Sequence, residues 1–192
     1  MAAIPGLVFD GSPGVVRETV PGAGDRPDDS YGSPMWPTAE GSTSATPTSR
    51  HVPLDARGAE LVTCVWEALE LPGSAMDYHF VLQDAVDRLW SGRRADPAGL
   101  ELLEVFARLD LELMEAAPQA VSFDAAGAPE RFVRVSSVPR LIGLLEREGV
   151  FADALDLARR LARFGQGQDV AARLAEKAGA LVAEAAASGG PA

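Results

Sequence analysis

From Leu54 onward, apolar residues recur at the three- and four-residue spacing of amphipathic helices. In the first predicted helix, Leu61, Val65 and Leu69 share one face, Asp55 is the expected N-cap, and Pro72-Gly73 ends the pattern. Similar patterns follow over about 74–90, from the Asp96-Pro97 cap to 117, and over 137–148, 152–164 and 169–187. This spacing predicts an all-α fold of antiparallel helical hairpins over residues 54–188.

One stretch of this body, residues 119–135, breaks the helical rhythm. Val121 and Phe123 precede a segment containing Gly127 and Pro129, and Phe132, Val133 and Val135 come after it. Short apolar runs on both sides of a turn favour a small β-hairpin or an ordered loop inserted between helices.

Residues 1–53 have a different composition. They hold 8 of the 14 prolines, and only 8 of these 53 residues are Ile, Leu, Val or Phe, too few to offset chain entropy. We expect a disordered or extended N-terminal tail and linker. Its large apolar side chains, Phe9, Tyr31 and Trp36, leave a second interpretation open, a peptide that docks on a partner or on the chain's own body.

The charge balance limits the classes of partner. The chain has 17 basic and 28 acidic residues, a formal charge of −11, and residues 54–130 alone carry 5 basic and 15 acidic residues. Binding to duplex nucleic acid or to an anionic membrane needs clustered cations, so both partners are disfavoured. We expect instead a protein or peptide partner. A possible homo-oligomer, formed by head-to-tail pairing of an acidic and a mildly basic half, is left open.

The location of the protein is predicted from what its sequence lacks. No signal peptide or membrane helix is evident, and the single cysteine, Cys64, excludes an internal disulfide. We therefore expect a cytoplasmic protein. Its basic residues are almost all arginine, with Lys177 the only lysine, which is typical of a high-GC bacterial genome.

Five residues of the second half share a recognisable spacing. Leu141, Leu145, Gly149, Phe151 and Ala154 read L-x-x-x-L-x-x-x-G-x-F-x-x-A. This pattern resembles a tetratricopeptide-type helical repeat, in which the glycine ends the first helix, the aromatic residue packs into the turn and the small residue lets the second helix approach.

The match is best over 138–165 and looser over 76–116, which lacks the glycine and the aromatic residue. Gly165-Gln166-Gly167 also replaces the proline expected at the end of the repeat. The resemblance implies a short array of stacked hairpins with a groove for a peptide or a protein surface.

Groups that could carry chemistry are sparse. The two histidines, His51 and His79, have no neighbours at metal-ligand spacing, so we expect no metal site and no cofactor. Cys64 falls on an apolar helix face and is interpreted as a core residue. His79, with Gln83 and Asp84 one turn further on, could act as a general base only with an oriented substrate and a carboxylate partner, so a hydrogen-bonded or exposed helix residue is favoured. The carboxylate pairs Asp84/Asp87 and Glu101/Glu104 are interpreted as a solvated helix face.

These observations favour a non-enzymatic protein–protein interaction module, a tetratricopeptide-like adaptor or scaffold. The expected binding residues lie on the first helix of each repeat-like hairpin, 76–116 and 138–165: Tyr78, His79, Gln83, Asp87, Arg140 and Arg147. One alternative is a small acidic inhibitor of the immunity or antitoxin type that masks a basic partner. A second alternative is a helical-bundle enzyme or ligand-binding protein that uses His79 and nearby carboxylates.

Overall fold

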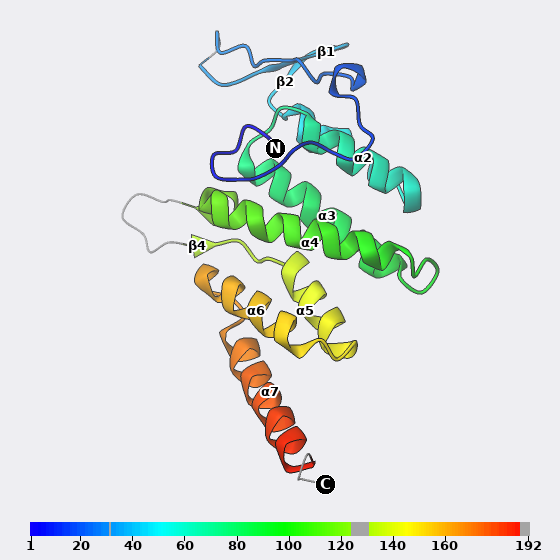
Figure 1. Cartoon of the computed structure of the whole chain (residues 1–192). Coiled ribbons are helices and arrows are strands. Elements are labelled where there is room, and N and C mark those ends of the chain that lie inside the picture. Colours follow the sequence, from blue (N-terminus) through cyan, green and yellow to red (C-terminus); the bar gives the residue numbers. More distant parts are fainter. Residues whose placement is uncertain (31, 124–130, 189–192) are drawn as a thin grey trace. The chain divides into compact units, whose positions relative to one another are not determined.

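The structure is a computed structural model that describes residues 1–30, 32–123 and 131–188 (Figure 1). It divides into two compact units, Met1–Ser137 (unit 1) and Val138–Ala192 (unit 2). The described residues are mainly helical, with short antiparallel strand pairs, which confirms the expected all-α fold with a small β-hairpin insert. No helix in the described ranges is long and apolar enough to cross a membrane.

Unit 1 is built around three longer helices. Its elements in chain order are η1 (Arg17–Thr19), β1 (Trp36–Thr38), β2 (Gly41–Thr43), α1 (Pro47–His51), α2 (Gly58–Glu70), α3 (Ala75–Gly92), α4 (Gly99–Ala116), η2 (Pro118–Ala120), β3 (Ser122–Phe123) and β4 (Arg131–Phe132). Helix α3 packs against both α2 and α4, and α1 packs against α2 and α3. The predicted insert forms the antiparallel pair β3–β4, with Ser122 opposite Phe132.

The apolar stripes of these helices form the core as their spacing predicts. The stripe of α3 is buried at Val81, Leu82, Ala85 and Leu89, and α4 buries apolar residues on a broad face, as expected for a helix packed on two sides. The Phe106 ring of α4 meets Trp66 of α2 edge-on, with ring centroids 5.0 Å apart. Burial of these stripes holds the three helices together.

Two of the predicted helix starts are wrong. Helices α2 and α4 begin at Gly58 and Gly99, each three residues after the predicted N-cap, Asp55 or Asp96. Backbone turns take up the intervening residues, because the Asp96 amide bonds the Gly92 carbonyl and the Asp96 carbonyl accepts from Gly99. Helix α3 does have a side-chain cap, a reciprocal capping box between Ser74 and Asp77.

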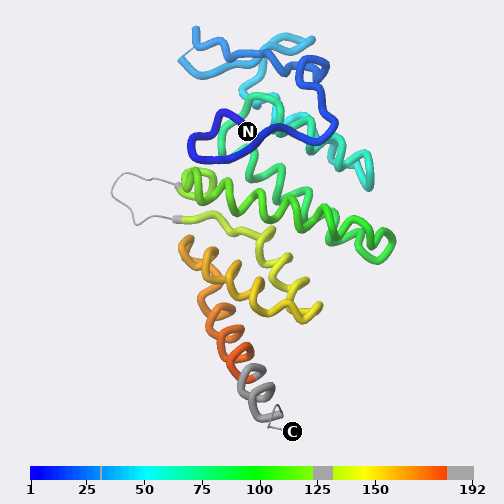
Figure 2. The backbone as a smooth tube through the Cα atoms, viewed as in Figure 1, coloured from blue at the N-terminus to red at the C-terminus, as the bar shows by residue number. Residues whose placement is uncertain are grey.

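The N-terminal segment, residues 1–53, belongs to unit 1 and lies along its helices (Figure 2). The expected boundary at 53/54 therefore does not coincide with the division of the structure. Most of the segment is extended or in turns, with a hairpin in which Trp36 lies opposite Thr43.

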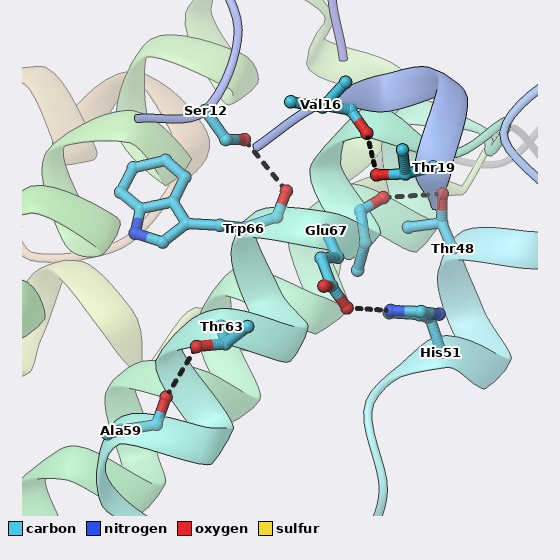
Figure 3. A network of polar contacts seen from close by, with 10 residues as sticks. Ser12, Val16, Thr19, Thr48, His51, Ala59, Thr63, Trp66 and Glu67 are labelled. Atoms are coloured by element: carbon cyan, nitrogen blue, oxygen red, sulfur yellow. Dashed lines mark hydrogen bonds and ion pairs between the residues drawn. The ribbon is translucent and has the colours of Figure 1, made fainter. Parts of the chain in front are cut away.

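This segment is anchored by hydrogen bonds to the last turns of α2 (Figure 3). The Ser12 hydroxyl donates to the Trp66 carbonyl at 2.8 Å, and the Met1 amine donates to the Leu69 carbonyl at 2.6 Å. The Thr48 hydroxyl lies within 3.1 Å of the Ala68 carbonyl and 2.9 Å of the Leu71 carbonyl. The last four carbonyls of a helix have no α-helical partner, so the donors to Leu69 and Ala68 act as its C-terminal cap, and the Ser12 hydroxyl adds a bond just before them.

Thr48 is also held by close packing. A Cβ built on Gly73 would lie 2.7 Å from the Thr48 hydroxyl oxygen, so only glycine leaves room for this approach. The Thr48 amide donates to the Pro72 carbonyl at 3.2 Å, which joins α1 to the turn after α2.

Unit 2 consists of three helices. Helix α5 (Ser137–Arg147) starts on the last residue of unit 1 and is followed by α6 (Phe151–Leu161), η3 (Ala162–Phe164) and α7 (Gln168–Ser188). The predicted stripes of α5 and α6 are buried: Val138, Leu141, Ile142, Leu145, Ala154, Leu157, Ala158 and Leu161. Of the predicted stripe of α7, Leu174 is fully buried, and Val170 and Ala178 are half-buried.

An ionic cluster holds α7 against the end of α5. Glu146 accepts from both terminal nitrogens of Arg173, with one contact at 2.9 Å, and from Lys177 at 3.4 Å. The hydrogen bonds from Arg173, with its positive charge and that of Lys177, lower the pKa of Glu146 to about 2. Lys177 also lies 4.4 Å from the centre of the Phe151 ring.

Replacing Glu146 with Gln should loosen α7. The pKa of Glu146 is depressed by folding, so its contribution to stability is present above pH 4.5 and is lost as the pH falls through about 2. At neutral pH we expect amide hydrogen exchange in α7 to rise roughly twofold to fivefold in E146Q. The matched control is E148Q, which removes an exposed carboxylate one residue after α5, and equal exchange in the two variants would contradict the assignment.

The cap on α2 can be tested through Thr48. The change Thr48→Val keeps the side-chain shape but removes the hydroxyl donor, so the free energy of unfolding of unit 1 should fall by about 1 kcal/mol. Thr63→Val, which removes an exposed hydroxyl from the same helix, serves as the control and should change the stability by less than about 0.5 kcal/mol. Chemical denaturation measures both, and an unchanged T48V protein would count against the cap.

Candidate functional site

The four binding residues predicted on α3 lie in two different environments. Tyr78 is 3% exposed and His79 is 0% exposed, so both lie in the core and not on the expected binding face. The helix turns their positions toward α2 and α4, and the Tyr78 hydroxyl donates to the Leu71 carbonyl at 2.6 Å. Burial is the main cause that raises the pKa of this hydroxyl.

Gln83 and Asp87 are half-buried and bind the chain that leads into α5. The Gln83 side-chain oxygen accepts from the Ser136 amide at 2.7 Å, and an Asp87 carboxylate oxygen accepts from the Ser136 hydroxyl at 2.8 Å. Both side chains therefore hold the segment after β4 in place.

The other predicted residues belong to unit 2 or to the N-terminal segment. Arg140 is half-buried and Arg147 is exposed, and both belong to unit 2, so neither unit gathers the six expected binding residues. In the N-terminal segment Phe9 is half-buried and Trp36 is 8% exposed, while Tyr31 lies outside the described residues.

A fully buried polar network joins His79, Asp110 and Ser137. The His79 ring nitrogen Nδ1 lies 2.7 Å from one oxygen of Asp110, and the other oxygen of Asp110 accepts from the Ser137 hydroxyl. All three residues are 0% exposed. Helices α3, α4 and the start of α5 each supply one of these residues.

Serine, histidine and aspartate together invite comparison with a hydrolase triad, but their order here differs. In a triad the histidine lies between the other two and accepts the serine proton. Here the carboxylate lies between them, and the buried Nε2 atom of His79 has no hydrogen-bond partner among the described residues. With no exposed surface at any of the three, this arrangement ties helices together and offers no reacting group to a substrate.

Sequence reasoning missed this network because its members are far apart in the chain. Asp110 is 31 residues from His79 and 27 residues from Ser137. One signal is present in the sequence, since Asp110 shares an otherwise apolar helix face with Leu103, Ala107 and Met114, which lie at helical spacing from it. A carboxylate at such a position must find partners inside the protein.

The remaining candidates for chemistry are isolated. His51 pairs with Glu67 of α2 at 2.8 Å, which places it against the body of unit 1 and not in an open linker. Cys64 is half-buried, and desolvation, together with Glu67 and Glu60, raises the pKa of its thiol. The described residues contain no group of three or more histidine, cysteine or carboxylate side chains that could hold a metal ion.

Comparison with known proteins gives no further assignment: no family model, no curated protein and no solved structure matches the chain.

Substitutions in the network of His79, Asp110 and Ser137 should lower the stability of the protein by amounts that depend on which residue is removed. Asp110→Ala leaves His79 and Ser137 buried without their partner, so we expect the free energy of unfolding to fall by about 3–5 kcal/mol. Ser137→Ala removes one donor and should cost about 1–2 kcal/mol. Denaturant titration of both variants, with the exposed Glu112→Ala as control on the same helix, measures the difference. A D110A protein within about 1 kcal/mol of the wild type would show that the network contributes little.

Proposed function

We propose that this protein is a non-enzymatic interaction module whose unit 1 binds a basic protein or peptide surface. The observation that carries the proposal is the distribution of charge between the two units. Residues 1–137 hold 10 of the 17 basic and 21 of the 28 acidic residues, so the formal charge of −11 falls wholly in unit 1. Residues 138–192 hold seven of each and are neutral overall.

The outer face of α4 supports an electrostatic contact. Glu101, Val105 and Glu112 are exposed at spacings that place them on one side of the helix. Glu101 and Glu112 form no ion pair with any described residue, whereas Glu104 pairs with Arg108 at 2.7 Å. The face therefore offers two uncompensated carboxylates beside the apolar side chain of Val105, a combination suited to a cationic and partly apolar partner.

We also propose that α5 and α6 of unit 2 form a tetratricopeptide-like hairpin, and the turn between them supports this. Gly149, at φ +79°, ends α5, and the Val150 amide donates to the Leu145 carbonyl at 2.8 Å, as in a Schellman motif. Ala154 is fully buried on α6. These are the roles that the repeat pattern implies for its glycine and its small residue.

Among the alternatives, an inhibitor of the immunity or antitoxin type is favoured by the net negative charge of unit 1, since an inhibitor that covers a basic partner needs an acidic surface. The enzyme alternative has less support, because His79 has no exposed surface. A cytoplasmic location and a bacterial source stay predictions from composition.

An oligoarginine peptide is a defined probe for this function. We expect unit 1 to bind it in the full-length protein, with an affinity that falls as salt rises. The double variant E101Q/E112Q should bind roughly twofold to tenfold more weakly. The matched control is E148Q/E176Q, which removes two exposed carboxylates from unit 2. Isothermal titration calorimetry at several salt concentrations measures all three proteins.

Two results would overturn the proposal. One is the absence of binding at low ionic strength. The other is an equal loss of affinity in the two double variants, which would mean that only the total charge of the chain matters.

A further inference from the structure

A cavity of about 720 Å³ lies in unit 1, between the N-terminal segment and the turn that joins α2 to α3. Met1, Arg17 and Trp36 line it from the N-terminal side, and Leu71, Ser74 and Tyr78 line it from the helical side. Its size falls within the range of pockets that hold small molecules or short peptide ends, about 300–1,000 Å³. No residue of α4 lines the cavity, so a ligand bound there is independent of the proposed function.

The apolar part of the lining is well fixed. Met1, Trp36, Leu71 and Tyr78 are between 2% and 8% exposed, so their side chains are held by the surrounding protein. The Tyr78 hydroxyl is already bonded to the Leu71 carbonyl, and the Met1 amine to the Leu69 carbonyl. This wall is therefore suited to an apolar or aromatic group.

Arg17, one of the polar residues that line the cavity, has unused hydrogen-bond donors. Its guanidinium makes a single long hydrogen bond, from Nη2 to the Ala23 carbonyl at 3.4 Å, and its other nitrogens bond no described residue. An arginine has five N–H donors in a planar fork that matches a carboxylate. Arg17 thus has the capacity for a bidentate contact with an anion.

The positive charge of Arg17 affects the pKa values of two other groups that line the cavity, the Met1 amine and the Tyr78 hydroxyl. Desolvation is the main cause that lowers the pKa of the Met1 amine to about 5; Glu70 opposes this shift and Arg17 adds to it. Arg17 also lowers the pKa of Tyr78, whose net shift is upward because of burial. Arg17, Met1 and Tyr78 line the same cavity.

The two carboxylates in the lining are engaged with the chain itself. Glu70 accepts from the Ser12 amide at 2.5 Å, and Asp77 accepts from the Ser74 amide at 2.8 Å and from its hydroxyl at 2.6 Å. Their acceptors are partly used, but their negative charges remain and disfavour a ligand with two or more negative charges. A singly charged anion fits better than a phosphate.

From the fixed apolar wall, the spare donors of Arg17 and the two engaged carboxylates, we infer that this cavity binds a monocarboxylate that carries an apolar body. The carboxylate pairs with Arg17, and the apolar body lies against Trp36, Leu71 and Tyr78. Two sources share this chemistry: the free C-terminus of a peptide with an apolar last residue, and a small aromatic or aliphatic acid.

Matched acids and amides test the inference in the full-length protein. The probes are phenylacetate with phenylacetamide, and an N-acetylated tripeptide ending in leucine with its C-terminal amide. We expect at least one of the two acids to bind, and its amide to bind at least about tenfold more weakly, since a charged hydrogen-bonded contact is lost. The acid that binds more tightly identifies the source.

The change Arg17→Gln should lower the affinity for the acid by at least about tenfold and leave the amide unaffected. Arg26→Gln is the matched control, because Arg26 is an exposed arginine of the same segment that does not line the cavity. Equal unfolding free energies of the two variants would show that R17Q is folded.

Three results would overturn the inference. They are the absence of binding by both acids, equal binding of an acid and its amide, and equal affinities of R17Q and R26Q for the acid. Calorimetry measures each of them.

Discussion

The C-terminal end of α2 is the point on which the organisation of unit 1 depends. A helix that stops in a protein interior leaves carbonyl groups that must find donors. In this protein the donors to these carbonyls come from far away in the sequence, the Met1 amine and the Thr48 hydroxyl, and the Ser12 hydroxyl bonds the carbonyl of Trp66 just before them. The same contacts that complete the helix also fix an N-terminal segment with few apolar residues, and they create the cavity between that segment and α3.

The helices of the body could be predicted because their signal is local. The period of residues such as Leu82 and Leu89 on α3, or Leu141 and Leu145 on α5, depends only on the helix that carries them, and all four are buried. The insert could be predicted for the same reason, from short apolar runs on either side of a turn. Helix starts were less accurate, because at Asp55 and Asp96 a backbone turn competes with the cap and precedes the helix.

The particular contacts of the N-terminal segment and of the buried network could not be predicted, because they join residues far apart in the sequence. Composition describes how much apolar area a segment can bury, but not whether a serine at position 12 will meet a carbonyl at position 66. In the same way, the sequence predicts His79 as a binding residue, whereas the structure pairs it with Asp110 inside the core. A buried polar residue is stable only with its partner, and a single sequence does not name that partner.

The Met1 contact has a consequence for measurement, since Lys177 is the only lysine of the chain. When Met1 carries its free α-amine, the described structure holds two primary amines, one in each unit. The α-amine is buried against Leu69, whereas the ε-amine on α7 is largely exposed. An amine-directed acylating reagent therefore meets an internal standard on Lys177. The relative rate at which Met1 is acylated reports how often the N-terminal segment leaves α2, without an added label.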